Sequence, residues 1–530
     1  MKKRTLSFIL ALAMLAALPV MAGASSWADD MMKDLLGKGI LAAIPEAPDE
    51  FIKREEFSVM LAKAMLYRTG DSLKAGVATV FADNDEIFSG NVAYILYLYE
   101  QGILRGSMID GKLYMLPNSL ITRQEAMALL GRWLGLNPDL PVSQEKLFTD
   151  DDTIQDYARS IIYQLVGMSV VTGYPDGSYM PVRNISHAET SSLIFKVLNG
   201  KILQSYFGNG DLGNADGGPR ASMFSMPYGL CLDNSGNLVV FDTFNASIKR
   251  ISGGLSVTML GFTDALDDYE FTMPYYLDGK QEEAMFGRPV DGVYNADGDF
   301  FIVDRENHAI RVLLGDTVYT YAGGVQGFGN GRNEDAMFDS PSAIAIDKSG
   351  VLYVADTMNH CIRKIDTDRT VSTIAGRAGT PGYANANGSA ALFCEPSGIA
   401  VDSEGAIYVA DTGNHVIRKI SGGFVTTVAG TVSSVESGED YAPGGSFNFP
   451  RGLCWADGKL YIADTGDHTV KMLTGDGNVS TVAGSGEPGD RDGTPDTAML
   501  NNPASVVYSN GVLYIADTFN NKIKSVWLDK

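Results

Sequence analysis

The side chains best suited to chemistry in this sequence are histidines that recur at one position of a repeat. The chain has five histidines, and four of them occupy equivalent positions: His308, His360, His415 and His468. Imidazole is the commonest metal ligand in proteins, so such a set suggests a metal site. Each histidine, however, belongs to its own repeat, and one ion cannot reach ligands in separate repeats at distances of about 2 Å. We therefore expect these histidines to be structural and predict no metal site.

Aspartates recur in the same repeat and could also be mistaken for catalytic groups. They are Asp242, Asp304, Asp356, Asp411, Asp464 and Asp517. Each ends an apolar run and opens a turn, where its carboxylate is expected to accept backbone amides of that turn. The chain contains no Gly-x-Ser-x-Gly, Walker or His-Glu-x-x-His motif. We therefore predict no catalytic residue and no cofactor.

The elements that position these residues repeat about every 53 residues, a period typical of propeller blades. A proline opens each unit: Pro227, Pro289, Pro341, Pro396, Pro450 and Pro503. Two apolar runs rich in Ile, Val and Tyr follow, then a tight turn and two further short runs. Four short strands per unit predict a six-bladed β-propeller.

The two ends of this region predict how the ring closes. The last repeat stops at Trp527 with only three strands, while residues 202–208 upstream of the first repeat read as a lone strand. The linker from Gly208 to Pro227 has the same length as the linker from Gly484 to Pro503. We therefore expect an N-terminal strand to complete the last blade and remove its free edge.

The repeats of residues 202–530 resemble NHL repeats. Residues 356–365 and 411–420, both of the form Asp-Thr-x-Asn-His-x-Ile-Arg-Lys-Ile, carry the resemblance most clearly. Members of that family mostly bind protein, nucleic acid or small ligands, and a minority of related six-bladed proteins are metal-dependent lyases or hydrolases. The resemblance thus implies a binding module, with a surface-anchored metal-dependent lyase or lactonase as the alternative.

One linker is the best candidate for ligand contact in the propeller. It runs from Gly261 to Pro289, longer than the other linkers between repeats, and long loops on rigid scaffolds concentrate binding residues. Its acids and aromatics would suit an extracellular protein or a glycan, and the candidates are Asp267, Asp268, Tyr269, Phe271, Tyr275 and Tyr276. The alternative is a tolerated insertion without function.

Residues 25–200 read as amphipathic helices in three similar segments. Ala158, Ile161, Ile162 and Leu165 follow helical spacing on one face, so each helix needs partners to cover its apolar stripe. The second helix of each segment follows a related motif: Ile52-Lys53-Arg54-Glu55-Glu56, Ile121-Thr122-Arg123-Gln124-Glu125 and Ile185-Ser186-His187-Ala188-Glu189. Thr122 with Glu125, and Ser186 with Glu189, form predicted capping boxes. The pattern predicts a bundle of three helix pairs.

These segments resemble S-layer homology repeats. Residues 79–145 and 146–200 carry the resemblance, most clearly in Gly173-Tyr174-Pro175-Asp176-Gly177, and residues 25–78 look like a degenerate first copy. The resemblance implies attachment to pyruvylated cell-wall polysaccharide through Arg54 and Arg123, with His187 departing from the family's arginine in the third groove. An Arg fork suits a ketal carboxylate because it forms two parallel charge-assisted bonds. The alternative is that these arginines are ordinary surface residues.

The N-terminus and the composition indicate the compartment. A basic start, an apolar run to Leu18 and Ala22-Gly23-Ala24 predict a signal peptide over residues 1–24, with an uncleaved membrane anchor as the alternative. No later stretch is apolar enough to span a membrane. The net charge of −23 argues against nucleic-acid partners. Four cysteines are too few for a disulfide scaffold, although Cys361 and Cys394 could pair.

Together these patterns predict a multidomain, secreted, wall-attached bacterial surface protein. Its fold class is an all-α bundle of three S-layer-homology-like repeats, the first degenerate, followed by an all-β six-bladed NHL propeller closed by an N-terminal strand. The expected partners are a cell-wall polysaccharide and an unknown extracellular protein or glycan.

Overall fold

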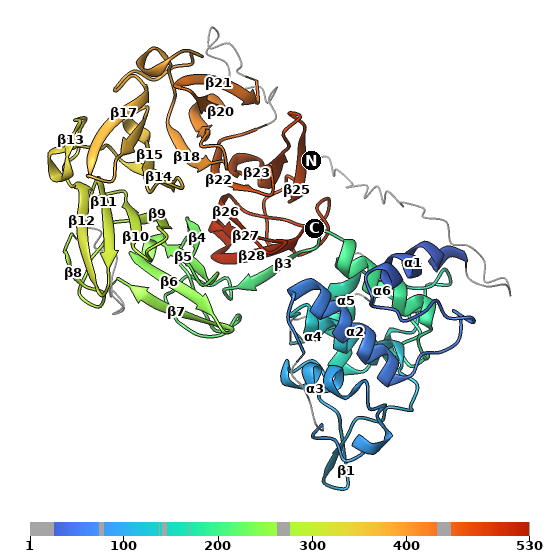
Figure 1. Ribbon diagram of the computed structural model, residues 1–530. Coiled ribbons are helices and arrows are strands. Elements are labelled where there is room, and N and C mark those ends of the chain that lie inside the picture. The colour runs from blue at the N-terminus through green and yellow to red at the C-terminus, as the bar shows by residue number, and fades with distance from the viewer. Residues whose placement is uncertain are drawn as a thin grey trace, which may run out of the picture. The chain divides into compact units, whose positions relative to one another are not determined.

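The computed structural model describes residues 26–73, 79–136, 138–139, 146–168, 170–261, 276–431 and 447–528. The chain divides into two compact units, Met1–Leu198 and Asn199–Lys530. The first consists mainly of helices, and the second is a ring of β-sheets (Figure 1). Within the described residues, no helix combines the length and the apolar character needed to cross a membrane.

The described residues of the helical unit form three helix pairs and one small hairpin. The pairs are α1 (Asp29–Gly37) with α2 (Arg54–Thr69), α3 (Val92–Glu100) with α4 (Arg123–Trp133), and α5 (Asp156–Gly167) with α6 (His187–Asn199); the hairpin is β1 (Ser107–Ile109) with β2 (Lys112–Tyr114). The predicted apolar face of α5 is buried, because Ala158, Ile161, Ile162 and Leu165 are at most 3% exposed. Both predicted capping boxes form, at Thr122 with Glu125 and at Ser186 with Glu189.

The three pairs are joined by a closed circle of backbone hydrogen bonds at the segment before each second helix. The amide of Ile52 donates to the carbonyl of Ile185, that of Ile185 to Ile121, and that of Ile121 to Ile52, at 3.0, 3.1 and 3.3 Å. All three isoleucines are fully buried. The degenerate first segment therefore occupies the same structural position as the other two.

The second unit is a six-bladed β-propeller whose blades are antiparallel sheets (Figure 1). Blade 1 has strands β4 (Leu230–Leu232), β5 (Leu238–Asp242), β6 (Ser247–Ser252) and β7 (Leu255–Leu260); blade 2 has β9 (Pro289–Tyr294), β10 (Phe300–Asp304), β11 (Ala309–Leu314), β12 (Thr317–Gly323) and the short β8 (Gly279–Lys280). Blade 3 has β14 (Pro341–Ile346), β15 (Leu352–Asp356), β16 (Cys361–Ile365), β17 (Thr370–Gly376) and the short β13 (Gly331–Arg332). Blade 4 has β18 (Pro396–Val401), β19 (Ile407–Asp411), β20 (Val416–Ser421) and β21 (Phe424–Ala429). Blade 5 has β22 (Pro450–Ala456), β23 (Lys459–Asp464), β24 (Thr469–Leu473) and β25 (Val479–Ala483).

Blade 6 combines both ends of the propeller sequence. Its strands β26 (Pro503–Ser509), β27 (Val512–Asp517) and β28 (Lys522–Trp527) are followed in the sheet by β3 (Leu203–Phe207), which pairs antiparallel with β28. Blade 6 also bonds directly to blade 1, since the Thr518 hydroxyl donates to the Pro227 carbonyl at 2.8 Å and the Met226 amide donates to Asn521 Oδ1 at 3.0 Å. The ring is therefore continuous from blade 6 to blade 1.

The propeller core lies between neighbouring blades. One apolar cluster joins Val303 and Ile310 of blade 2 to Ile344 and Val354 of blade 3, all of them buried. Because each blade covers its neighbour's apolar face in this way, the ring stabilises the blades collectively.

Candidate functional site

The three residues predicted to bind polysaccharide occupy equivalent positions in the helical unit. Arg54, Arg123 and His187 are the first residues of α2, α4 and α6. Each side chain forms one ion pair with the capping glutamate of another repeat. The pairs are Arg54–Glu125 at 2.5 Å, Arg123–Glu189 at 3.3 Å and, when the imidazole is charged, His187–Glu56 at 3.9 Å. The three junctions between repeats therefore share one design.

The guanidinium of Arg123 is largely occupied by the protein itself. Its side chain is 9% exposed, it donates to the Tyr174 hydroxyl at 2.9 Å and the Thr172 carbonyl at 2.7 Å, and it lies 4.7 and 4.8 Å from the rings of Tyr174 and Tyr179. Burial raises the pKa of Tyr174 to about 12, so its hydroxyl stays neutral and can receive this bond. Arg123 therefore stabilises the junction, and only a small part of its side chain is left to contact a ligand.

A second arginine, Arg183, is the more accessible cation at this junction. Its side chain is 35% exposed and contacts Glu189 at 2.9 Å. Although burial opposes the effect, hydrogen bonds from Tyr174, the Ser186 amide and Arg183 lower the pKa of Glu189, which keeps it ionised. The motif analysis missed Arg183 because it lies in the loop before the motif. Aligning the three loops would have revealed it, since Ser119 and Glu50 stand at its place in the other junctions.

In the propeller, the repeated aspartates hold the linker that precedes each blade. One carboxylate oxygen accepts an amide 16 or 17 residues upstream, as from Ser225 to Asp242 at 2.6 Å and from Cys394 to Asp411 at 2.8 Å. We expected each carboxylate to accept amides of the turn that it opens. This was wrong for the amide donor, which lies in the linker before the blade. In five blades the other oxygen accepts the side chain of the asparagine three residues later.

A cation seven residues after each aspartate completes this arrangement, and it is buried in every blade except blade 5, where Lys471 is partly exposed. The six pairs are Asp242/Lys249, Asp304/Arg311, Asp356/Arg363, Asp411/Arg418, Asp464/Lys471 and Asp517/Lys524. The three arginines and their aspartates have no exposed side-chain surface and are 2.6 to 3.0 Å apart. Burial raises the pKa of Asp411 to about 6, although Arg418 opposes this shift. These groups are structural, and their seven-residue spacing was present in the sequence but not noticed.

Tyr276, one of the predicted ligand contacts, takes part in the same structural network. Its ring lies 4.8 Å from the guanidinium of Arg311, and its hydroxyl is 2.6 Å from the Thr320 hydroxyl. Tyr383 makes the equivalent contacts with Arg418 and Thr427 in blade 4. The other candidates lie outside the described residues: Asp267, Asp268, Tyr269, Phe271 and Tyr275.

The recurring histidines connect adjacent blades. Each has a left-handed backbone conformation, and its Nδ1 accepts the amide of the residue before the next blade's proline at 3.0 to 3.1 Å: His308 from Ser340, His360 from Glu395, His415 from Phe449 and His468 from Asn502. Asn521 does the same for Met226. Among the described residues, no group of three or more His, Cys, Asp and Glu side chains is arranged to hold a metal ion.

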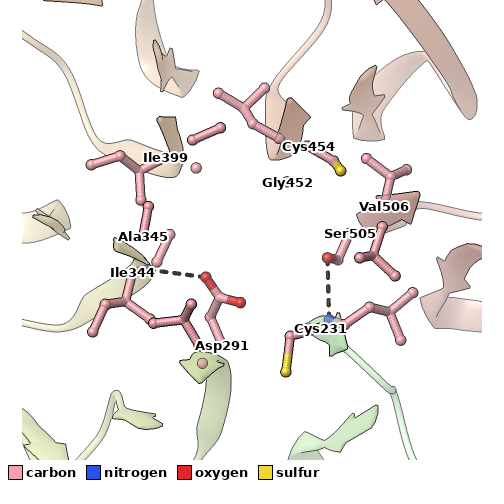
Figure 2. Close-up of a pocket in the computed structure, with 18 of the residues that line it drawn as sticks. Cys231, Asp291, Ile344, Ala345, Ile399, Gly452, Cys454, Ser505 and Val506 are labelled. Carbon is pink, nitrogen blue, oxygen red and sulfur yellow. Dashed lines mark hydrogen bonds between the residues drawn. The ribbon is translucent and has the colours of Figure 1, made fainter. Parts of the chain in front are cut away.

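A channel of about 300 Å³ runs between the innermost strands of the six blades. Polar groups and apolar residues both contribute to its wall, and Ile344, Ile399 and Val506 are among its residues (Figure 2). The residue two positions after the proline of each repeat lines the channel and faces the neighbouring blade. These six residues are Gly229, Asp291, Ala343, Gly398, Gly452 and Ser505. Asp291 stands out because the other five are small and uncharged.

The cysteines are all free in the structure. Cys361 is buried in β16 and Cys394 is partly buried, so the disulfide considered for this pair is absent. Cys231 and Cys454 line the channel, where burial raises the pKa of Cys454 to about 11. These thiols therefore remain protonated at neutral pH.

Comparison with known proteins gives partial matches in both units. The family model described as S-layer homology domain matches residues 147–191, the third helical repeat, and that described as NHL repeat matches residues 338–365 and 393–420. The two preceding helical segments, 25–78 and 79–145, are not covered by that match.

Curated relatives match part of the chain. NHL repeat-containing protein 2 of Gallus gallus is 30% identical over 264 residues, covering 42% of this chain and 36% of that protein. Protein SUPPRESSOR OF QUENCHING 1, chloroplastic, of Arabidopsis thaliana is 31% identical over 286 residues, covering 48% of this chain and 26% of that protein. The chain thus spans about a third or less of the length of these relatives.

Solved structures match part of the chain at low similarity. An auxiliary nutrient binding protein from Bacteroides ovatus has a TM-score of 0.45 and 17% identity, covering 62% of this chain and 77% of that chain. Virginiamycin B lyase from Staphylococcus aureus has a TM-score of 0.38 and 13% identity, covering 62% and 99%. Similarity at this level has no bearing on function. The chain contains an S-layer homology domain at residues 147–191, which associates it with a bacterial cell surface, and NHL repeats within a six-bladed β-propeller.

Proposed function

We propose that this protein is secreted and attached to the bacterial cell wall through its helical unit, and that its propeller binds an extracellular protein or glycan. The observation that carries the proposal is the S-layer homology match combined with three equivalent junctions bearing Arg54, Arg123 and His187. The predicted signal peptide of residues 1–24 supplies the export step.

The proposed ligand of the helical unit is an acidic wall polysaccharide of the pyruvylated type. A ketal carboxylate is planar and anionic, so a guanidinium can bind it through two parallel bonds. The surroundings of the three junctions differ in charge. The Arg123 junction holds Arg183 and Glu189, whereas the His187 junction holds Glu50 and Glu56. We expect the Arg123 junction to bind the anion best and the His187 junction to bind it least.

The propeller's proposed binding surface is the face that carries the 261–289 linker. This linker is the longest between blades, and a rigid ring would present it without rearrangement. Such a surface suits recognition of a macromolecule, because large contacts need a fixed scaffold and accessible loops.

The test is retention of the full mature chain by purified cell walls. Arg183→Gln should weaken wall binding by about tenfold or more, because it removes a charge-assisted contact without touching the buried Arg123. Arg105→Gln, which changes an exposed arginine of the same unit, is the matched control and should bind as the parent does. Equal retention by walls stripped of their secondary polysaccharide would refute the proposed ligand.

A further inference from the structure

The channel contains an acidic group that the proposed function does not use. Among the described residues lining the channel, Asp291 has the only charged side chain. It belongs to β9, and its carboxylate reaches into the ring towards Ile344 of the next blade (Figure 2). The side chain remains partly accessible from the channel.

The partners of Asp291 do not neutralise its charge. Oδ2 accepts the amide of Ile344 at 3.0 Å, and the backbone amide of Gly292 is its other donor. Burial raises the pKa of Asp291 to about 7, and no cationic side chain of the described residues offsets this effect. Near pH 7 this carboxyl group is therefore partly protonated, and a cation that binds beside it stabilises the ionised form.

Blade 6 shows that a carboxylate is not needed for the structural part of this role. Ser505 stands at the equivalent position and accepts the amide of Leu230 at 3.2 Å, as Asp291 accepts that of Ile344. A neutral hydroxyl therefore satisfies the same inter-blade amide. The negative charge of Asp291 is left without a structural reason.

The wall of the channel indicates what kind of cation would fit. A divalent metal ion needs several oxygen, nitrogen or sulfur ligands, and only one carboxylate is present among the described lining residues. Partly exposed apolar residues of the innermost strands, among them Leu232, Ile346, Val401 and Val507, would instead contact an apolar body. The volume of about 300 Å³ is of the size typical of small-ligand sites.

We propose that the channel of the propeller binds a small organic amine, with the ammonium group against Asp291 and the apolar body against the innermost strands. This proposal uses none of the residues predicted for the linker surface or for the wall-binding junctions, so it does not depend on either. Arg451 is not among the lining residues, but it donates to the hydroxyl of Tyr228, which is one of them.

The test is calorimetric titration of the full mature chain with isopentylamine and with isopentyl alcohol, which has the same apolar body without the charge. We expect saturable binding of one amine per chain and binding of the alcohol at least about tenfold weaker. Asp291→Asn should weaken amine binding by a similar factor, since Asn retains an acceptor for the Ile344 amide.

Two further variants keep the result interpretable. Asp291→Ser copies the residue of blade 6 and should fold and lose amine binding even if the Asn variant does not fold. Asp297→Asn removes an exposed carboxylate of the same blade and should bind the amine as the parent does. Absence of saturable amine binding, equal affinities for amine and alcohol, or unchanged affinity in the folded Asp291 variants would overturn the proposal.

Discussion

The buried pair of Asp411 and Arg418 allows a quantitative test of what holds each blade. The guanidinium donates to Asp411 at 2.6 Å, to the carbonyls of Leu392 and Ala384 at 3.0 and 2.8 Å, and to Asn385 at 2.9 Å. It also lies between two aromatic rings, those of Tyr383 and Phe393, at 4.7 and 5.0 Å. Neither charged side chain is exposed, so water cannot replace a lost partner.

Replacing one member of this pair should therefore lower the free energy of unfolding substantially. We expect Arg418→Met and Asp411→Asn each to lower the free energy of unfolding by about 3–5 kcal/mol, because each leaves a buried charge without its counter-ion. The double variant leaves neither charge, so its loss should be smaller than the sum of the single losses by about 1 kcal/mol or more.

Urea unfolding of the full chain, followed by circular dichroism, measures these differences. Lys419→Met is the matched control, since this neighbouring residue is partly exposed and its ion pair with Asp402 is long, at 3.6 Å, so its loss should cost at most about 1 kcal/mol. Additive losses, or a loss below about 1 kcal/mol for Arg418→Met, would refute the argument that charge pairing dominates.

Three other predictions concern the propeller. Burial lowers the pKa of three inter-blade histidines, His360, His415 and His468, so their contribution to stability is complete above the unfolded value of about 6.5 and is lost as pH falls below it. When the pH is lowered from about 7.5 to about 5, the melting temperature of the parent should therefore change less favourably than that of a variant with Asn at these three positions, and identical pH profiles would contradict the assignment. Deleting β3 should expose the edge of β28, lower the melting temperature and cause aggregation detectable by light scattering; a chain that melts like the parent would contradict this role. Replacing residues 264–274 by a short Gly-Ser linker should leave the melting temperature unchanged. Extending the deletion to Asp278 should destabilise the ring by about 1–3 kcal/mol, because the bonds of Asp278 to Arg311 and Thr320 are lost. Equal melting temperatures of the two deletion variants would contradict this role of Asp278.

The sequence predicted the six-bladed ring because its determinants are local and repeated. Proline at the start of each innermost strand and aspartate at the end of the second strand recur at nearly constant spacing, and the strands between them have high β propensity. The partners of these residues were harder to predict, because a carboxylate can accept any nearby amide. The donor to Asp411 comes from Cys394, in the preceding linker, and only the fold brings these residues together.

The candidate sites show the same division between local and long-range information. Arg54, Arg123 and His187 could be found from a motif, whereas Arg183 belongs to a loop that packs beside the motif of another repeat. Asp291 could have been found by comparing the six repeats position by position, because it is the one acid where the other blades have Gly, Ala or Ser. Its surroundings, however, depend on closure of the whole ring.

The circle of bonds among Ile52, Ile121 and Ile185 fixes the number of helix pairs in the first unit. Linear repeat arrays can lengthen or shorten one unit at a time, because their ends are covered by separate capping units. In this circle every amide and carbonyl is already assigned, so removing one pair would leave a buried donor and a buried acceptor without partners. The first pair can therefore diverge in sequence at the surface without becoming dispensable.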